Sequence, residues 1–254
     1  MSNGGGTEMT PEPDPAAVPD GLVSAVVHLV GTGPVLLGAY TVAELTAVDA
    51  VVDFLEARPS DEVLAEAVRS LAARQLLVGG PDGQQVQVRG DLGIAVAFQQ
   101  RARLVLDARV TGTRAGEPWR ILLLPQPEQI CLMVRIDALG VHELGLYPLD
   151  EALRQLAGWL PKGDRAVPGS AGDPDEVLAA AHRSALITVT RYTAQGSAET
   201  AGTSTDLILA ARDGKLHEFR RDPADPAALV PGPQDGADVR ARLDGLLAGD
   251  VRAG

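Results

Sequence analysis

The sequence predicts an α+β fold: two quasi-equivalent halves, each a β-meander closed by a helix, with an antiparallel sheet and an N-terminal helical pair. The first observation is that residues Arg103–Leu160 contain three strand-like segments and then an amphipathic helix. The second is that the same order of elements returns before Leu247, with little residue identity between the copies. A repeated architecture indicates two related halves that share a sheet or a pseudo-twofold axis.

Alternating apolar segments predict the strands of the first half. In the outer two of three segments every second residue is apolar, which is typical of antiparallel strands with one face on a core. The connectors 111–118 and 125–128 are rich in turn residues and short enough for hairpins. A stripe of leucines over Leu149–Leu160 then predicts a helix. The three predicted strands are Leu104–Val110, Trp119–Leu124 and Gln129–Ile136.

Capping residues predict the N-terminal helical pair. Thr41 and Glu44 have the spacing of a capping box, which begins a helix that we expect to reach about Ala57. Ser60 caps a second helix over Glu62–Arg74. The expected buried stripe of this second helix is Val63, Leu64, Ala67, Val68, Leu71 and Ala72.

The segments on either side of this pair follow weaker patterns. Residues 22–30 are apolar and fit either a strand or a short helix, and their β-branched valines favour the strand. A Gly-rich turn after the second helix leads into a short strand over Gln84–Arg89. Asp91 is expected to cap a helix that ends near Gln100.

The second half begins at Asp173–Pro174, which predicts a short helix through His182. Its strands are expected at Ser184–Tyr192, Thr205–Ala211 and Lys215–Arg220, and its last helix is lined by Val239, Leu243, Leu246 and Leu247. The predicted boundaries are a disordered tail over 1–20, a first half over 21–161, a linker over 162–173 and a second half over 174–248. Together the halves are expected to form one compact domain.

Charge and composition narrow the classes of partner. The formal net charge is −12, which disfavours nonspecific binding to DNA or to an anionic membrane because their phosphates would repel the chain. The sequence shows no apolar signal segment and no apolar run long enough to span a bilayer. The single cysteine, Cys131, is expected to be a buried thiol, and the lack of any intrachain disulfide suits the cytoplasm.

No motif predicts a catalytic, cofactor or metal site. The Gly-rich loops at 31–34 and 79–83 lack the spacing and the lysine of phosphate-binding loops. His142–Glu143 lies between a strand and a helix without further ligands, so a solvated loop is expected there. Trp119 opens the second strand beside a Gly-bearing loop, and both edge packing and a role as a binding anchor stay open.

Several short segments of the sequence occur in an order that matches one protein family. They are Thr41–Leu45 at the start of a helix, Leu71–Leu77 at the end of another, Leu104–Arg109 with the hairpins, Tyr147–Leu149 before a helix that ends at Trp159–Pro161, and Leu186–Arg191. Over about residues 22–248 the chain resembles the EspG-like proteins, cytosolic chaperones of type VII (ESX) secretion in actinobacteria.

The resemblance implies a mixed α/β fold with quasi-twofold halves, no enzymatic activity, and cytosolic binding of a secreted helical client of the PE/PPE type. It also implies that the client's helical tip contacts the loop Thr111–Pro118 and the C-terminal region Asp235–Leu247. No cofactor, nucleic acid or membrane is expected as a partner. The partner-binding residues expected on this ground are Thr111, Gly112, Thr113, Arg114, Glu117, Trp119, Val239 and Leu243.

Two other classes of function stay open. An enzyme or small-ligand-binding domain would gather its residues only in three dimensions, and a deep pocket with convergent titratable side chains would reveal it. A winged-helix-like regulator would use the helix and hairpin within Asp61–Arg89 and would need a basic face around Arg69, Arg74 and Arg89.

Overall fold

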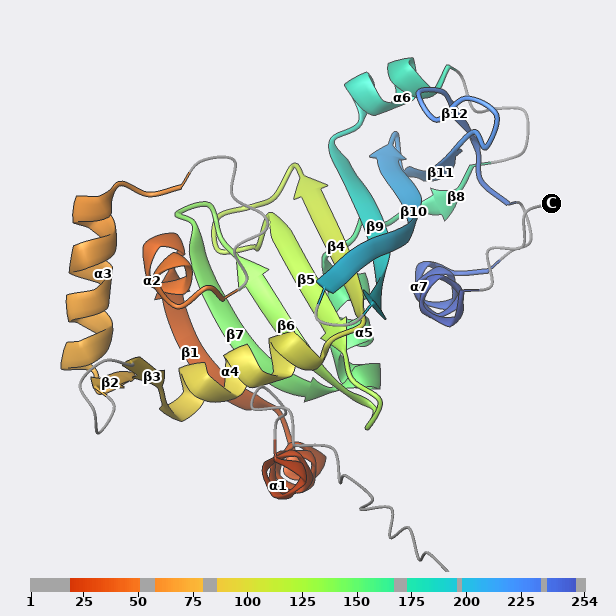
Figure 1. The fold of residues 1–254 in the computed structure, drawn as a ribbon. Helices are drawn as coiled ribbons and strands as arrows, with labels where there is room; N and C mark the ends of the chain where they lie inside the picture. Colours follow the sequence, from red (N-terminus) through yellow and green to blue (C-terminus); the bar gives the residue numbers. More distant parts are fainter. Residues whose placement is uncertain are drawn as a thin grey trace, which may run out of the picture.

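The computed structural model describes residues 19–50, 58–79, 86–166, 173–195, 198–233 and 237–249. Within these ranges the chain forms seven helices, a largely antiparallel sheet of 10 strands and a separate two-stranded sheet (Figure 1). The predicted α+β class is therefore confirmed. Among the described helices, none combines the length and the apolar character needed to cross a bilayer. Most of the predicted tail, up to residue 18, lies outside the described residues.

The N-terminal part of the described chain holds the helical pair, a hairpin and the first edge strand of the large sheet. The elements are α1 (Asp20–Thr32), β1 (Val35–Thr41), α2 (Val42–Ala47), α3 (Asp61–Ala73), β2 (Leu77–Gly79), β3 (Val86–Val88) and α4 (Gly90–Arg101). In Figure 1, α3 and the β2–β3 hairpin stand at one side of the sheet.

Of the two alternatives left open for residues 22–30 the helix is correct and the favoured strand is wrong, because this segment is helical in α1. Val23, Val26 and Val30 are spaced for one helical face and are buried, whereas Leu29, outside this stripe, is 52% exposed. β-branched residues favour a strand only weakly, and burial of one helical stripe outweighs that preference. The strand follows instead as β1.

The two predicted caps of the helical pair are confirmed, but the first helix is shorter than expected. Thr41 and Glu44 form the capping box of α2, and the Ser60 side chain caps α3. α2 ends at Ala47 because Asp49 takes a left-handed φ of 54°, which a continuing helix does not allow. Residues 51–57 of the predicted helix lie outside the described residues.

The predicted buried stripe of α3 is only partly correct. Ala67 and Leu71 are buried, but Val63 is 49% and Val68 41% exposed. The reason is that α3 packs against α2 and β2 at the side of the molecule, so a narrow stripe of its side chains is buried. Asp91 is not the cap of α4: it lies in the first turn, after Arg89, where its charge complements the helix dipole.

The first meander contains one strand more than predicted. Its elements are β4 (Leu104–Thr111), β5 (Arg120–Pro125), β6 (Ile130–Ile136), β7 (Val141–Pro148) and α5 (Leu149–Trp159). β7 was expected to be a loop, yet Leu144 and Leu146 face a core. Gly145 leaves room for the ring of Tyr147, since a Cβ there would lie 2.8 Å from it.

The second half repeats this order. Its elements are β8 (Asp164–Arg165), α6 (Pro174–Ala180), β9 (Arg183–Gln195), β10 (Ala198–Arg212), β11 (Lys215–Arg221), β12 (Leu229–Pro231) and α7 (Val239–Ala248). Asp173 caps α6 as expected, although the helix ends before His182. The predicted linker over 162–173 contains β8, which pairs in parallel with β11, so part of it belongs to the sheet.

The strand order shows how the two halves share the sheet. The order is β1-β7-β6-β5-β4-β9-β10-β11-β12. β4 and β9 pair antiparallel at the junction, from Leu104 opposite Arg191 to Thr111 opposite Ser184. Each is the first strand of its meander, and the following strands are added outward in opposite directions. This arrangement is the one expected of two halves related by a local twofold axis at the β4–β9 pair.

Helices cover both faces of the sheet (Figure 1). α4 and α6, which precede the two meanders, lie on one face, where Phe98 of α4 packs with Leu122 and Val177 of α6 packs with Ile208. α5 and α7, which end the meanders, lie on the opposite face and share a core that contains Leu243. Each half therefore has one helix before its strands and one after them, on opposite faces.

Between the cores under α4 and α6, the same face carries a polar row. Asp107 lies opposite Leu122 of β5 and Thr188 of β9, and Thr188 lies opposite Asp206 of β10. The guanidinium of Arg120 donates two hydrogen bonds to Asp107, of 2.9 and 2.7 Å. The Thr188 hydroxyl donates to Asp206 at 2.7 Å. The row crosses the junction of the two halves, with the Arg120–Asp107 pair on the first half and the Thr188–Asp206 hydrogen bond on the second.

Candidate functional site

The predicted binding loop lies at one end of the sheet, together with segments from both halves. The β4–β5 loop, residues 112–119, begins after Thr111, which is opposite Ser184 at the start of β9. It ends at Trp119, whose backbone N–H donates to the carbonyl of Ile136 at 3.0 Å. The β6–β7 turn, residues 137–140, follows Ile136 directly. Three segments that are distant in the sequence therefore meet here.

A turn in the middle of the β4–β5 loop is closed by both backbone and side chain. The Glu117 N–H donates to the carbonyl of Arg114 at 3.0 Å, and Gly116 takes the positive φ, 83°, that the third position of a type II turn requires. The Glu117 carboxylate accepts from the Arg114 N–H at 3.0 Å. The loop thus contains the turn that its turn-rich sequence predicts, closed by two hydrogen bonds between Arg114 and Glu117.

The base of the loop is held close to β9. The hydroxyls of Thr111 and Ser184 are 2.8 Å apart, and the Ser184 N–H donates to Thr111 Oγ1 at 3.2 Å. Gly112 has a φ of 67°, and a Cβ at this position would lie 2.1 Å from the carbonyl oxygen of His182. Glycine is therefore required at this position.

Arg183, the first residue of β9, joins the loop to the end of α5. Its Nη1 donates to Glu117 Oε2 at 2.7 Å. Its Nε and Nη2 donate to the carbonyl of Trp159, the last residue of α5, at 3.2 and 2.7 Å. The backbone N–H of Arg114 and the guanidinium of Arg183 hold the pKa of Glu117 below its usual value. Sequence reasoning missed Arg183, because nothing near it in the sequence indicates the loop.

Trp119 and Leu139 form an exposed apolar pair beside this loop. Trp119 is 39% exposed, while its indole N–H donates to the carbonyl of Asp137 at 2.9 Å. Leu139, two residues further in the β6–β7 turn, is 87% exposed. The Asp137 carboxylate accepts from the N–H groups of Leu139 and Val141, which fixes the turn. We call Trp119 and Leu139 the apolar pair. Leu139 was not predicted.

The two predicted residues of α7 have different surroundings. Leu243 is fully buried in the core between α5, α7 and the sheet, so its prediction as a partner-binding residue is wrong. The resemblance places the binding region in this segment but does not show which side of α7 will pack, and α7 packs through Leu243 and Leu246. Val239 is partly exposed and lines a hollow of about 480 Å³ with Ala157 and Pro161, near the end of α5. Val239 and the β4–β5 loop therefore both lie near that end of α5.

No protein-family model matches this sequence, and no curated protein matches it. The grounds for a function are therefore the surface chemistry and the geometry of the described residues. The resemblance to the EspG-like family stays a prediction.

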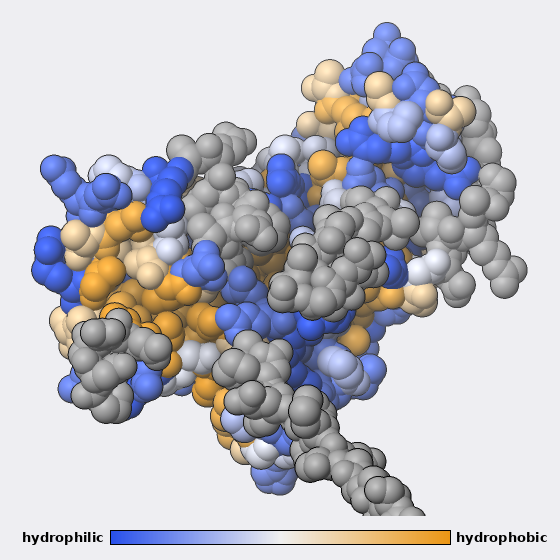
Figure 2. Space-filling view, viewed as in Figure 1, coloured by the Kyte–Doolittle hydropathy of each residue, from blue (hydrophilic) through white to orange (hydrophobic). Residues whose placement is uncertain are grey.

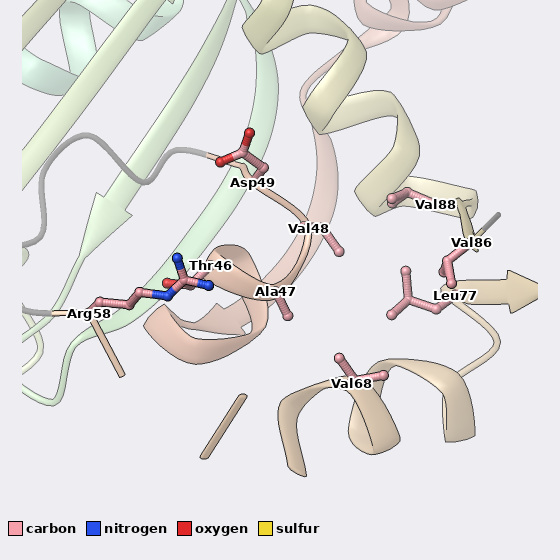
Figure 3. Close-up of a pocket in the computed structure, with 9 residues that line it drawn as sticks. All are labelled: Thr46, Ala47, Val48, Asp49, Arg58, Val68, Leu77, Val86 and Val88. Carbon is pink, nitrogen blue, oxygen red and sulfur yellow. The ribbon is translucent and has the colours of Figure 1, made fainter. Parts of the chain in front are cut away.

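A second hollow lies away from the loop, between α2, α3 and the β2–β3 hairpin. Its volume is about 610 Å³, and its lining is mostly apolar, with Val68, Leu77 and Val86 pointing into it (Figure 3). Thr46, Asp49 and Arg58 add polar groups, which Figure 3 shows away from those three side chains. Figure 2 shows apolar surface gathered over this part of the molecule. The apolar lining side chains could contact a small apolar ligand.

Cys131 and His142 are buried in the sheet. Cys131 is fully buried as expected, and burial raises the pKa of its thiol to about 12, which keeps it protonated at neutral pH. The expectation of a solvated loop at His142 is wrong: this residue lies in β7, is 6% exposed, and burial lowers its pKa. Among the described residues, no group of three His, Cys, Asp or Glu side chains is placed to hold a metal ion.

The arginines of the predicted winged-helix region form local contacts. α3 and the β2–β3 hairpin are adjacent, as that hypothesis requires. Arg69 pairs with Glu66 at 2.7 Å and Arg74 with Glu44 at 2.9 Å, while Arg89 donates to the Gln87 side chain at 3.1 Å. Two of the three cations are thus balanced by carboxylates, which weakens any basic face for DNA.

Proposed function

We propose that this chain is a cytosolic chaperone or adaptor that binds a helical client of type VII (ESX) secretion, such as a PE/PPE-type protein, and that it catalyses no reaction. The observation that supports this proposal most strongly is the apolar pair, Trp119 and Leu139. Both side chains are exposed, yet both belong to hydrogen-bonded turns at one end of the sheet. Burial against a client would remove this exposed apolar surface from water.

The surroundings of the apolar pair suit a protein partner. Tryptophan is enriched among the few residues that dominate the free energy of protein interfaces. The β4–β5 loop, which ends at Trp119, carries polar residues that include Thr113 and the exposed Arg114, and these would form the polar rim of such an interface. An amphipathic helical tip could place apolar side chains on the pair and polar ones on the rim.

The net charge of the chain also agrees with a carrier function. A formal charge of −12 keeps a protein soluble while it carries a partner with apolar surface. It also attracts clients that have a basic surface, which speeds their association at low salt.

The proposal predicts that Trp119→Ala weakens client binding without unfolding the protein. Candidate clients are the helical products of neighbouring genes, co-expressed with this chain and tested for copurification and affinity. Trp119→Ala should weaken binding by at least about 30-fold, as expected when an interface hot spot is truncated. The matched control is Leu36→Ala, since Leu36 is 63% exposed on the distant edge strand β1. Unchanged affinity of Trp119→Ala, or no client for the wild type, would overturn the proposal.

The apolar hollow between α2 and α3 favours a second candidate, a small-ligand-binding function. Its volume of about 610 Å³ falls in the range of small-molecule pockets. Native mass spectrometry of the purified protein would show a copurified ligand as added mass. Val68→Arg should abolish that added mass, because it places a charge among the apolar lining residues. An added mass that persists in Val68→Arg would argue against this candidate.

A further inference from the structure

We infer that Arg183 is the positioning residue of the binding surface: it fixes the β4–β5 loop before the client arrives. This inference rests on the proposed function, because it assigns a regulation of affinity to the same surface. The new element is that part of the affinity for the client comes from the ordered β4–β5 loop of the free protein. Arg183, a residue of the second half, supplies this order and need not touch the client.

The guanidinium of Arg183 holds the loop at its centre. Glu117 Oε2 accepts both the Arg183 Nη1 donor at 2.7 Å and the Arg114 N–H at 3.0 Å. The carboxylate is therefore shared between the turn and β9. The two ends of the loop have other contacts, through Thr111 with Ser184 and through Trp119 with Asp137. Loss of the Arg183 contact would detach the turn from β9 while leaving both ends of the loop attached.

Arg183 is itself fixed, which makes it an effective anchor. Two of its nitrogens donate to the carbonyl of Trp159 at the C-terminal end of α5, where carbonyls lack helical partners and the helix dipole is negative. The Arg183 side chain is 15% exposed and that of Glu117 29%, so water competes less here than at a fully exposed ion pair. A planar arginine held on one side directs its remaining donors at the loop.

Order in the free loop strengthens binding because ordering costs conformational entropy. A loop that is already fixed loses little freedom when the client binds, whereas a loose loop must be ordered at the expense of affinity. Trp119 is the last residue of this loop, two residues after Glu117, so the turn that Arg183 holds borders the apolar pair. We expect loss of the Arg183 contact to weaken client binding on the order of 10-fold.

The first test uses the free protein and needs no client. Arg183→Gln should speed hydrogen exchange of the Arg114 and Glu117 amides at least about 10-fold, since both belong to the turn that Arg183 holds. The matched control is Arg191→Gln. Arg191 lies on the same strand and donates to the carbonyls of Leu246 and Leu247 at 2.9 and 3.0 Å, so it caps α7 and not the loop. Unchanged exchange in Arg183→Gln, or equal acceleration in Arg191→Gln, would overturn the inference.

The second test measures client affinity with the same variants. Arg183→Gln should bind about 10-fold more weakly than the wild type, Arg183→Lys should regain part of the loss, and Arg191→Gln should bind as the wild type. Glu117→Gln, on the other partner of the contact, should accelerate exchange of the residue-117 amide, which bonds to the Arg114 carbonyl and not to the substituted side chain, even if Arg183→Gln does not fold. A loosened loop with unchanged affinity would overturn the inference but leave the proposed function standing. A wild type that binds no client would overturn the proposed function, and the exchange result would still decide whether Arg183 orders the loop.

Discussion

Glu44 joins α2 to α3 through a single buried carboxylate. Its Oε1 accepts from the Ser70 hydroxyl at 2.8 Å and from Arg74 at 2.9 Å, and its Oε2 accepts from the Thr41 N–H at 2.9 Å. Burial alone would raise the pKa of Glu44, but these donors outweigh it and hold the pKa below its usual value. One residue therefore serves as a helix cap and as a contact between two helices.

We predict that Glu44→Gln removes part of the acid sensitivity of the fold. Because the folded-state pKa is lowered, this stabilisation is complete above the usual value of 4.5 and is lost as the pH falls through the lowered pKa. The variant should lower the free energy of unfolding at neutral pH by about 1 to 3 kcal/mol. When urea unfolding is measured from neutral pH to about pH 3, the free energy of unfolding should then fall less steeply with pH in the variant than in the wild type.

The control for this prediction is Glu66→Gln. Glu66 pairs with Arg69 on the exposed side of α3, so its substitution should change the free energy of unfolding by less than about 1 kcal/mol. If Glu44→Gln and the wild type lost stability in parallel as the pH falls, the assigned contribution of Glu44 would be wrong.

At the scale of elements, two glycines determine the shape of the β4–β5 loop and predict different costs of substitution. Gly112→Ala places a Cβ 2.1 Å from the His182 carbonyl oxygen, whereas Gly116→Ala meets nothing within 4 Å. Both also take a positive φ that alanine disfavours. We expect Gly112→Ala to lower the free energy of unfolding by roughly 3 kcal/mol and Gly116→Ala by about 1 kcal/mol. Denaturant unfolding measures both, and equal losses would refute the close approach.

The pairing of β4 with β5 contains a buried ion pair that predicts a large stability effect. The Arg120 side chain is 5% and the Asp107 side chain 12% exposed, and two hydrogen bonds join them. Asp107→Ala leaves a buried guanidinium without this partner, so the free energy of unfolding should fall by about 3 to 5 kcal/mol. The control, Asp164→Ala, removes an exposed partner of Lys215 and should cost less than about 1 kcal/mol. Similar losses in thermal unfolding would contradict this assignment.

At the scale of the whole molecule, the two halves are joined by one sheet and one core. The β4–β9 pair connects the meanders, and the core under α5 and α7 contains Leu106 and Leu153 of the first half with Ile187 and Leu243 of the second. A half removed from this arrangement would expose that apolar surface. The repeat is therefore one of architecture, and the core under α5 and α7 is complete only when both copies contribute to it.

We predict that the two halves unfold in a single transition. Fluorescence of Trp119 and Trp159 reports on the first half, and amide exchange of Leu207–Ala211 in β10 reports on the second. Both probes should give the same midpoint in denaturant, because unfolding of either half would expose the shared core. Two separate midpoints would show that the halves are independent domains.

The sequence by itself determined the elements whose signals are local. The alternating strands β4 to β6, the helix α5 and the caps at Thr41, Ser60 and Asp173 were predicted within one or two residues. The extent of the β4–β5 loop also followed from its turn residues. Apolar alternation and capping involve neighbours in the chain, so one sequence shows them directly.

Only the tertiary structure decided the features that depend on distant partners. β7 was missed because His142, Glu143 and Gly145 resemble a loop until β6 and β1 pair on either side of them. Leu243 was expected to bind a partner from the resemblance, which places a residue in a segment but does not reveal that α5 and the sheet will cover it. Arg183 comes 66 residues after its partner Glu117, so the contact that orders the loop exists only once β9 lies beside β4.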